Sequence, residues 1–501
     1  MAYALVHGEV QTLDFTTKDT KSTKFKNINF RFFVSFVNFV VRSEFLVVPK
    51  EWRIDMGKTE TTLAQFALNV PTQDIPADVM HLAKRCVMNS CGVALYATLD
   101  PAVDILLDFL RAEGCAAQAT VIGKGFRTSP QNAALANGFL GHLEDYDDTH
   151  TTVIHPSAPI LPAALALSEQ RAVSGRDLLG AFAIGVDVAC RIGLVIYSHF
   201  REGAAHWHIT NTCGVLGAVA AAGRLLRLTE EQMVYAFAIA GTQASGVREV
   251  FGSMCKPFHA GRAAQNGLVA ALLAQRGFTG TDGIFEGERG LVGVMATGHD
   301  INEATKDLGT RWELPQTGLK PYACGQANHG FLDAALALRK KNGVSPQTIK
   351  HMQGSVQQFA PALVRRRHPR SGLESKFCYY HSIAVATIDG EALPAQFTDA
   401  RATDPAVEAL RDRIDFSEDP SLSRRAAVAT VELNDGTTYT ERIEHPTGTP
   451  GNPMTDAMVQ RKFNGLAAAA LGAEKAAKAQ RALWDIDKLS DVRELIPLVT
   501  K

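Results

Sequence analysis

The chain has 501 residues, of which 46% are hydrophobic and 21% charged, and its formal net charge is -1. This length exceeds one ordinary domain core and predicts two or three domains, while the near-neutral charge excludes a general attraction to nucleic acid or to an anionic membrane. The eight cysteines are scattered through apolar segments without a C-x-x-C pair, which favours free thiols in a reducing cytoplasm over disulfides, a zinc site or an iron–sulfur cluster.

The first 55 residues differ in character from the rest of the chain. Their aromatic stretch, residues 30–41, contains Arg31 and Asn38 and is too short and too polar to cross a bilayer. No small-residue cleavage site follows it, as a signal peptide would require. We therefore expect residues 1–55 to be an atypical extension outside the fold, with Met56 as the natural start; a basic targeting arm is the alternative.

From Thr61 the apolar spacing predicts one helix after another. Asp74 is expected to cap a helix that runs to about Ala97, and an amphipathic helix follows over 101–113. Because the later helices carry Ala and Gly on several faces, we expect them to pack closely around a buried centre. These later helices are predicted over residues 129–143, 156–172, 178–197, 214–226 and 233–244. Residues 56–315 are thus predicted to form a large all-helical domain, and no glycine-rich phosphate loop indicates a nucleotide.

The pattern changes near Trp312, and a mixture of helices and strands is predicted beyond it. The expected elements are a helix over 328–341, a strand over 349–358, helices over 374–389 and 404–413, and a hairpin over 428–441 around Asn434-Asp435-Gly436. From Thr455 the pattern is helical again. We therefore predict a mainly α fold with an inserted α+β lid domain, residues 316–450, and C-terminal helices, residues 451–501, that rejoin the helical domain.

Polar chemistry is densest in residues 141–157, between two apolar helices. This stretch holds four carboxylates and three histidines, among them Asp145, Asp148 and His155. Titratable groups in a crevice between buried helices have shifted pKa values and can carry out acid–base catalysis. The alternative is a solvated acidic loop, in which Asp145 and Asp148 are only the polar face of a helix end.

Lys256 and Lys320 are placed where an apolar environment is expected, each directly before a proline. A lysine among closely packed small residues either reaches solvent or meets a carboxylate. Two such lysines at helix ends facing a lid would suit an anionic substrate. The alternative is a metal site made of His206, His208, Asp145 and His155. No H-E-x-x-H motif supports it.

Several motifs, in this order, resemble the MmgE/PrpD family over about Thr61 to Leu498. They are Leu143-Glu-Asp-Tyr-Asp-Asp-Thr149, His155-Pro-Ser157, Trp207-His208, Lys256-Pro-Phe-His259, Lys320 and Gly372-Leu-Glu-Ser-Lys-Phe-Cys-Tyr379. Members of this family include 2-methylcitrate dehydratases, cis-aconitate decarboxylases and an iminodisuccinate epimerase. The resemblance implies a large helical domain with an inserted α+β lid, a homodimer, and no metal or organic cofactor. It further implies a lyase acting on a small di- or tricarboxylate, with an epimerase as the alternative.

The active-site positions of the decarboxylase members match this sequence in residue type. They fall on Asp145, Thr149, His155, His208, Lys256, Lys320 and Tyr379. One departure concerns a further histidine of the mammalian-type decarboxylase, whose position is Gly325 here. The run Lys320-Pro-Tyr-Ala-Cys324 resembles the fungal decarboxylase instead.

These family reactions all pass through carbanion-like states beside a carboxylate, which need cations or hydrogen-bond donors on the carboxylate oxygens and one placed acid or base. We expect Lys256, Lys320 and His208 to hold the carboxylates. His155 is the expected proton-transfer group, oriented by Asp145. Thr149 and Tyr379 are expected to donate hydrogen bonds, Tyr379 from the lid. Hypotheses from other classes are a metal-dependent hydrolase and a non-catalytic scaffold.

Overall fold

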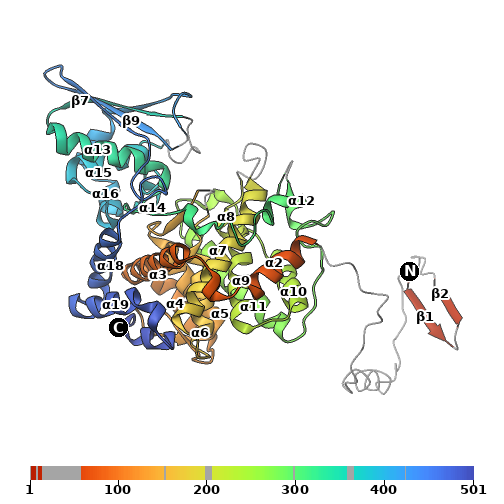
Figure 1. Ribbon diagram of the computed structural model, residues 1–501. Coiled ribbons are helices and arrows are strands. Elements are labelled where there is room, and N and C mark those ends of the chain that lie inside the picture. The colour runs from red at the N-terminus through yellow and green to blue at the C-terminus, as the bar shows by residue number, and fades with distance from the viewer. Residues whose placement is uncertain are drawn as a thin grey trace, which may run out of the picture. The chain divides into compact units, whose positions relative to one another are not determined.

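The computed structural model describes residues 58–501 apart from 152–153, 198–205, 297–299, 358–365 and 424, together with strands β1 (Ala2–Val6) and β2 (Glu9–Leu13) (Figure 1). The chain divides into two units, Met1–Ile54 and Asp55–Lys501. In the first unit β1 and β2 pair as an antiparallel hairpin. The prediction that residues 1–55 lie outside the fold concerns mostly residues outside the described ones, and it stays a prediction.

The second unit begins with a large helical region. Its helices bury nearly continuous apolar and small side chains, and α6 is buried along its whole length. The helices are α2 (Lys58–Asn69), α3 (Ala77–Ala97), α4 (Pro101–Glu113), α5 (Pro130–Leu143), α6 (Ser157–Ser168), α7 (Gly175–Tyr197), α8 (Ile209–Thr212), α9 (Gly214–Leu226), α10 (Glu230–Gly241), α11 (Cys255–Gln275) and α12 (Leu291–Met295).

Local capping explains where several of these helices begin. The Ser129 side chain accepts a hydrogen bond from the backbone N–H of Asn132 at the start of α5, and Thr229 with Gln232 forms a capping box at the start of α10. The predicted cap by Asp74 is wrong. Asp74 closes a short 3-10 turn, and α3 instead starts behind Pro76 without a side-chain cap, because the fixed φ of proline already suits a helix start.

The centre of the helical region depends on backbone approach between α5 and α11. A Cβ atom on Gly138 would lie 2.7 Å from the Cα of Gly261, and one on Gly261 would overlap the backbone oxygen of Leu135. Only glycine permits this separation, so the two helices touch through their backbones. The residues that follow at the end of α5, where the acidic stretch begins, are buried as well.

A smaller α+β region follows. Its four-stranded sheet has the order β10-β9-β7-β8, with β7 parallel to β8 and antiparallel to β9. Figure 1 shows α13 and α15 beneath this sheet. The elements are α13 (His329–Asn342), β7 (Ile349–Val356), α14 (Gly372–Ser375), α15 (Tyr379–Asp389), α16 (Asp399–Ala402), α17 (Pro405–Arg411), β8 (Ile414–Glu418), β9 (Ala427–Leu433) and β10 (Thr438–Ile443). The prediction of a mainly helical fold with a smaller sheet-containing domain is confirmed.

The single helix predicted over 374–389 is wrong in one respect. It is divided into α14 and α15 because Cys378 is extended and its sulfur accepts a hydrogen bond from the backbone N–H of His381, which starts a new helix. The break places Lys376 and Phe377, both buried, in the wall of a small cleft that residues at the end of α5 also line.

The C-terminal helices α18 (Asp456–Leu471) and α19 (Ala473–Trp484) pack on the helical region. Phe463 of α18 is buried in the main core and lies against Gly92 of α3, where an added Cβ would be 3.0 Å from the Phe463 ring. The chain therefore leaves the helical region for the α+β region and then returns to it. The boundary numbers of the predicted division stay a prediction.

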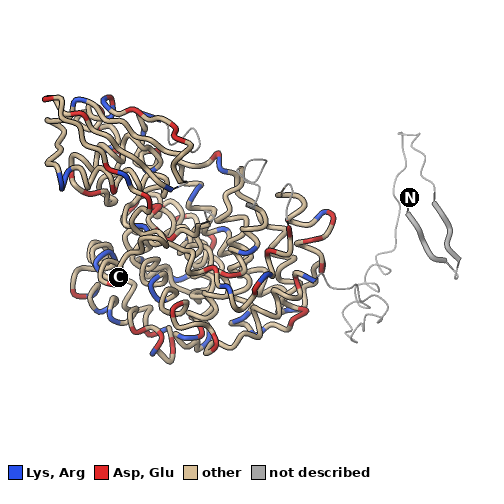
Figure 2. The backbone as a smooth tube through the Cα atoms, turned by 45° about the horizontal axis from the view of Figure 1, so that its top comes forward, with Lys and Arg blue, Asp and Glu red and all other residues tan. Residues whose placement is uncertain are grey.

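Two stretches, Gly175–Ile196 and Ile209–Leu226, are long and apolar enough to cross a membrane by composition. Of their apolar windows, 94% and 89% is buried inside the protein, as in core helices. Basic and acidic residues are interspersed along the described chain in Figure 2, in keeping with the small net charge.

We predict that Gly261→Ala lowers the stability of the protein although alanine favours helix. The new methyl group would overlap the Leu135 backbone oxygen, and overpacking of this kind costs about 1–3 kcal/mol. The matched control is Gly465→Ala in α18, where nothing lies within 4 Å and alanine should stabilise by about 0.5–1 kcal/mol. Urea unfolding followed by circular dichroism measures both. Equal shifts of the two midpoints would contradict the packing described here.

Candidate active site

The acidic stretch is buried where α5 ends. Every residue from Glu144 to His150 is buried, so the alternative of a solvated loop is wrong. Asp145 has a φ of 50°, in the left-handed region that aspartate tolerates better than most residues, and this turns the chain sharply after α5. Strand β5 (Asp148–His150) then pairs with β6 (Thr317–Leu319), which delivers Lys320 beside the acidic stretch.

Asp145 binds both predicted lysines through one oxygen. Its Oδ1 lies 2.9 Å from the Nζ of Lys256 and 3.0 Å from the Nζ of Lys320, and all three side chains are buried. Lys320 also donates to the backbone oxygen of Asp145 at 2.8 Å. Burial raises the pKa of Asp145, but the two ammonium groups outweigh burial and the net pKa is lowered. Asp145 is thus an ionised carboxylate that keeps two cations in an apolar interior.

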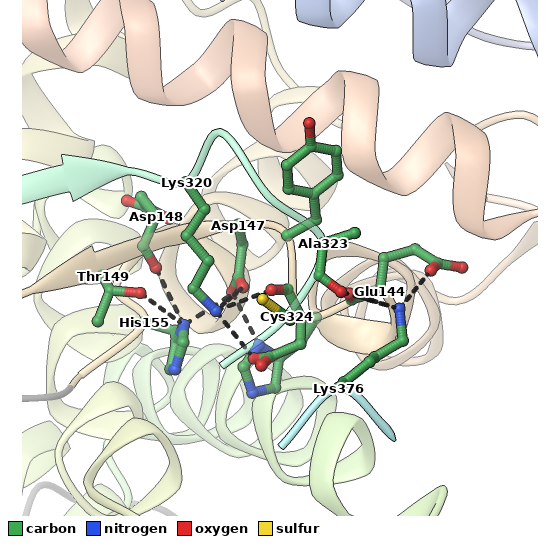
Figure 3. Close-up of polar contacts among 12 residues, drawn as sticks. Glu144, Asp147, Asp148, Thr149, His155, Lys320, Ala323, Cys324 and Lys376 are labelled. Carbon is green, nitrogen blue, oxygen red and sulfur yellow. Dashed lines mark hydrogen bonds and ion pairs between the residues drawn. The ribbon is translucent and has the colours of Figure 1, made fainter. Parts of the chain in front are cut away.

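Asp147, rather than the predicted Asp145, contacts the imidazole of His155. Its Oδ1 lies 3.2 Å from the Nδ1 of His155, and its Oδ2 lies 2.8 Å from the Nδ1 of His142 (Figure 3). Burial raises the pKa of Asp147, yet the two imidazoles lower it further, so it stays ionised. The prediction that Asp145 orients His155 is therefore wrong, because the left-handed turn directs Asp145 to the lysines instead.

His155 has one ring nitrogen held and one free. Its Nδ1 faces the backbone oxygen of Asp148 at 3.0 Å and the Oγ1 of Thr149 at 3.2 Å, in addition to Asp147. These oxygens assign the proton to Nδ1 and leave a lone pair on Nε2, for which no partner is found among the described residues. Burial lowers the pKa of His155, whereas the Asp147 carboxylate raises it. Such a histidine can accept a proton at Nε2 and return it.

His208 forms a second imidazole group beside this one. Its ring stacks on His142 with centroids 5.6 Å apart, and its Nδ1 lies 3.0 Å from the Nδ1 of His259. Its Nε2 is buried without a partner among the described residues. Burial and the nearby Lys256 lower the pKa of His208, so the ring is neutral. The open Nε2 marks a place for a ligand atom.

A small cleft connects these groups to the α+β region. The lining side chains include His142, Asp145 and Lys256 from the helical region, Leu373 from α14, and Lys376 and Phe377 from the break between α14 and α15. The Nζ of Lys256 lies 5.5 Å from the centroid of the Phe377 ring. One wall of the cleft is therefore cationic and the other partly aromatic.

Lys462 of α18 donates hydrogen bonds to the backbone next to Asp145 and at Lys320. Its Nζ donates to the backbone oxygens of Tyr146 at 2.6 Å and Lys320 at 2.8 Å, and to the Oδ1 of Asn89 at 2.7 Å. It lies 3.5 Å from the centroid of the Tyr146 ring. Lys462 thus fixes the two backbone segments that carry Asp145 and Lys320.

The structure brings together six of the seven residues carried over from the family resemblance and leaves out Tyr379. The Tyr379 ring packs against Phe331 and Phe416, 5.2 and 5.3 Å away, within the smaller hydrophobic core. Its predicted hydrogen bond to the site is unsupported, because the first turn of α15 directs this side chain toward the sheet. The six residues that do gather are Asp145, Thr149, His155, His208, Lys256 and Lys320.

Sequence reasoning singled out neither Lys462 nor four residues near or inside the motifs: His142, Asp147, His259 and Lys376. Two of them belong to the acidic stretch itself, and the other two lie inside the motifs Lys256–His259 and Gly372–Tyr379. The motifs and the acidic stretch therefore contained these four residues, but residue spacing alone did not indicate which of their side chains point into the site.

The cluster of His142, Asp145, Asp147 and His155 has ligand atoms within 4.8 Å of one another, as a metal site would. Several of its ligand atoms already have partners, however. Both nitrogens of His142 have partners, Asp147 and Lys256, and one oxygen of Asp145 carries two ammonium groups. The predicted rival ligand His206 is exposed. This donor set fits an ion-pair network better than a metal centre.

The chain is similar to known proteins along most of its length. Residues 61–304 match the model of the MmgE/PrpD N-terminal domain, and residues 322–488 match that of the C-terminal domain. The cis-aconitate decarboxylase of Aspergillus terreus is 28% identical over 473 residues, 87% of this chain and 95% of that protein. The mouse cis-aconitate decarboxylase is 28% identical over a match that covers 77% of this chain and 82% of the mouse protein. The 2-methylcitrate dehydratase of Cupriavidus necator is 24% identical, covering 73% and 81%.

We predict a distinct pH dependence from Asp148. Burial and the neighbouring Asp147 raise the pKa of Asp148 to about 7, while its oxygens accept hydrogen bonds from Ser157. The folded protein then keeps a proton that the unfolded chain releases, so this contribution to stability is full below the unfolded pKa and is lost as the pH rises through about 7. The slope is about 1.4 kcal/mol per pH unit.

Asp148→Asn should therefore stabilise the protein relative to wild type more at pH 8 than at pH 5, measured by urea unfolding. The exposed Asp108→Asn serves as the control and should follow the wild type at both pH values. If the difference between Asp148→Asn and wild type does not change with pH, the assignment of a retained proton to Asp148 is wrong.

Proposed function

This chain belongs to the MmgE/PrpD family, and from that premise we propose that it is a cofactor-independent lyase acting on a small tricarboxylate. Decarboxylation of cis-aconitate or a close analogue is the favoured reaction, supported by the decarboxylase relatives that cover 87% of the chain. Dehydration of a 2-methylcitrate-like substrate is the second candidate, supported by the dehydratase relative. The homodimer, the cytoplasmic location and the epimerase alternative stay predictions.

The observation that carries the proposal is the pair of ammonium groups that meet at one carboxylate oxygen. Lys256 and Lys320 converge on Oδ1 of Asp145 at 2.9 and 3.0 Å. Two cations so placed provide a ready site for substrate carboxylates, because the protein has already removed water from them. Asp145 is the counter-charge of both lysines in this structure.

In the decarboxylation, a carboxylate beside a carbon–carbon double bond leaves as CO2. The electron pair of the broken bond passes through the double bond onto a remaining carboxylate, which becomes an enediolate-like anion. Lys256 and Lys320 stabilise that developing charge, and the Nε2 of His155, once protonated, delivers a proton to carbon. The Asp147 carboxylate at the other ring nitrogen stabilises the imidazolium.

In the dehydration, the same groups work in the opposite sense. The neutral Nε2 of His155 removes a proton from the carbon beside a carboxylate, the lysines hold the resulting anion, and hydroxide leaves from the next carbon with a proton supplied by a neighbouring donor. His208, whose Nε2 has no partner among the described residues, is the candidate for holding a carboxylate or the leaving oxygen, with the Nδ1–H of His259 donating to its Nδ1 so that Nε2 carries the proton.

Gly325 removes one imidazole that the mammalian-type decarboxylase has. Its backbone N–H donates to the oxygen of Lys376 at 2.8 Å, and a Cβ at this position would lie 3.2 Å from the Phe377 ring. The proposed proton transfer therefore relies on His155, whose Nε2 meets no partner in the part of the chain that the structure describes.

The first test is incubation of the protein with cis-aconitate, 2-methylcitrate and substituted succinates, followed by NMR. We expect loss of CO2 from cis-aconitate, or loss of water from 2-methylcitrate, with activity that persists in EDTA. No change in any of these acids would overturn the proposal and favour a non-catalytic scaffold. Activity abolished by EDTA and restored by zinc or manganese would favour a metal-dependent enzyme.

A second test is His155→Gln. Loss of the proton-transfer group should lower kcat by about 10²- to 10⁴-fold with little change in the melting temperature. The control is His351→Gln, since His351 lies on β7 at the surface, paired with the exposed Asp415. A loss below about tenfold in His155→Gln would remove His155 from this role.

A further inference from the structure

Lys376 is a buried lysine to which the mechanism above gives no task. It lies in the break between α14 and α15 and is only 3% exposed. Its Nζ donates to both the Oε2 and the backbone oxygen of Glu144, each at 2.8 Å. Figure 3 shows this pair beside Ala323, to the side of the Lys320–His155 group. Burying a lysine this completely is costly unless the charge is paired, and Glu144 provides the counter-charge.

Lys376 lines the same cleft as Lys256 and Asp145. Glu144, its partner, is the residue directly before Asp145, so the two ion pairs are adjacent along the chain. The cleft is bounded on the side of Lys376 by Leu373 and Phe377, which shield the ammonium groups from solvent. A molecule that enters the cleft and reaches Lys256 is therefore within the same enclosure as Lys376.

The backbone of Lys376 is held in place by hydrogen bonds. Its backbone oxygen accepts hydrogen bonds from the N–H of Gly325 at 2.8 Å and from the Nδ2 of Asn328 at 2.9 Å. Both donors belong to the segment that follows Lys320. The backbone that carries Lys376 is thus tied to the backbone that carries Lys320.

The ion pairs of the cleft indicate which lysines could bind which substrate carboxylates. Lys256 and Lys320 share Asp145, while Lys376 has Glu144 to itself. Two of the three N–H groups of Lys376 donate to Glu144, and the third makes only a 3.5 Å contact with the backbone oxygen of Ala323, so a ligand carboxylate can bind the ammonium group while Glu144 stays paired. A dicarboxylate would be satisfied by the first two lysines, whereas a tricarboxylate has one carboxylate more.

We propose that Lys376 is the specificity-determining cation that binds the third carboxylate of a tricarboxylate, with Glu144 holding it in place. This inference rests on the proposed function. It makes the α+β region responsible for distinguishing tricarboxylates from dicarboxylates.

The test is calorimetric binding of two unreactive acids, tricarballylate with three carboxylates and glutarate with two. In Lys376→Gln, the Kd of tricarballylate should rise by about 10- to 100-fold and that of glutarate by less than about threefold. Lys376→Gln combined with Glu144→Gln should give the same result, which excludes the buried Glu144 charge as the cause. Lys376→Arg should recover part of the tricarballylate affinity. For the reaction itself, KM should rise more than kcat falls.

Equal weakening of both acids in the single and double variants would assign Lys376 a merely structural role and overturn the inference. So would unchanged binding of tricarballylate. In either case wild-type activity on a tricarboxylate would leave the proposed function standing. If the wild type neither binds tricarballylate nor converts any acid in the NMR panel, both the proposed function and this inference are wrong.

Discussion

The buried carboxylate of Asp145 is the constraint on which the rest of the site depends. Two lysine ammonium groups taken out of water need a counter-charge, and Asp145 supplies it through one oxygen. To reach them, the chain must turn through a left-handed residue directly after α5, and β5 must pair with β6 so that Lys320 arrives beside it. The same turn releases Asp147 to lie between His142 and His155. One local conformation thus separates the cation-binding carboxylate from the histidine-orienting one.

The surrounding helices make this arrangement stable. Glycine contacts between α5 and α11 bring their backbones together, and the residues at the end of α5 are buried. Exclusion of water strengthens each ion pair in the cluster, and it also makes an unpaired charge there expensive. The small residues that the sequence places on several faces of these helices therefore have an electrostatic consequence as well as a packing one.

Long periodic helices could be predicted from the sequence because each buries a face for many turns; α4 and α9 have the predicted bounds. The site residues were identified largely from the family resemblance. Which of them pair with one another could be seen only in the structure. Asp145 and Asp147 differ by two positions, and only the backbone turn decides which one faces His155. Tyr379 was misplaced for a similar reason, since the Cys378 cap that restarts the helix is not evident from apolar spacing. Strand β8 was missed because its residues 414–418 are mostly polar and its partner β7 is distant in sequence.

Lys462 links this site to the order in which the chain is made. Its ammonium group holds the carbonyls of Tyr146 and Lys320, although α18 lies more than a hundred residues beyond either of them. During synthesis on the ribosome, the segments bearing Asp145 and Lys320 emerge long before the helix that fixes them. A nascent chain that ends before α18 therefore contains Asp145 and Lys320 but lacks the lysine that fixes their backbone segments. The final geometry of the site forms only after α18 has been translated.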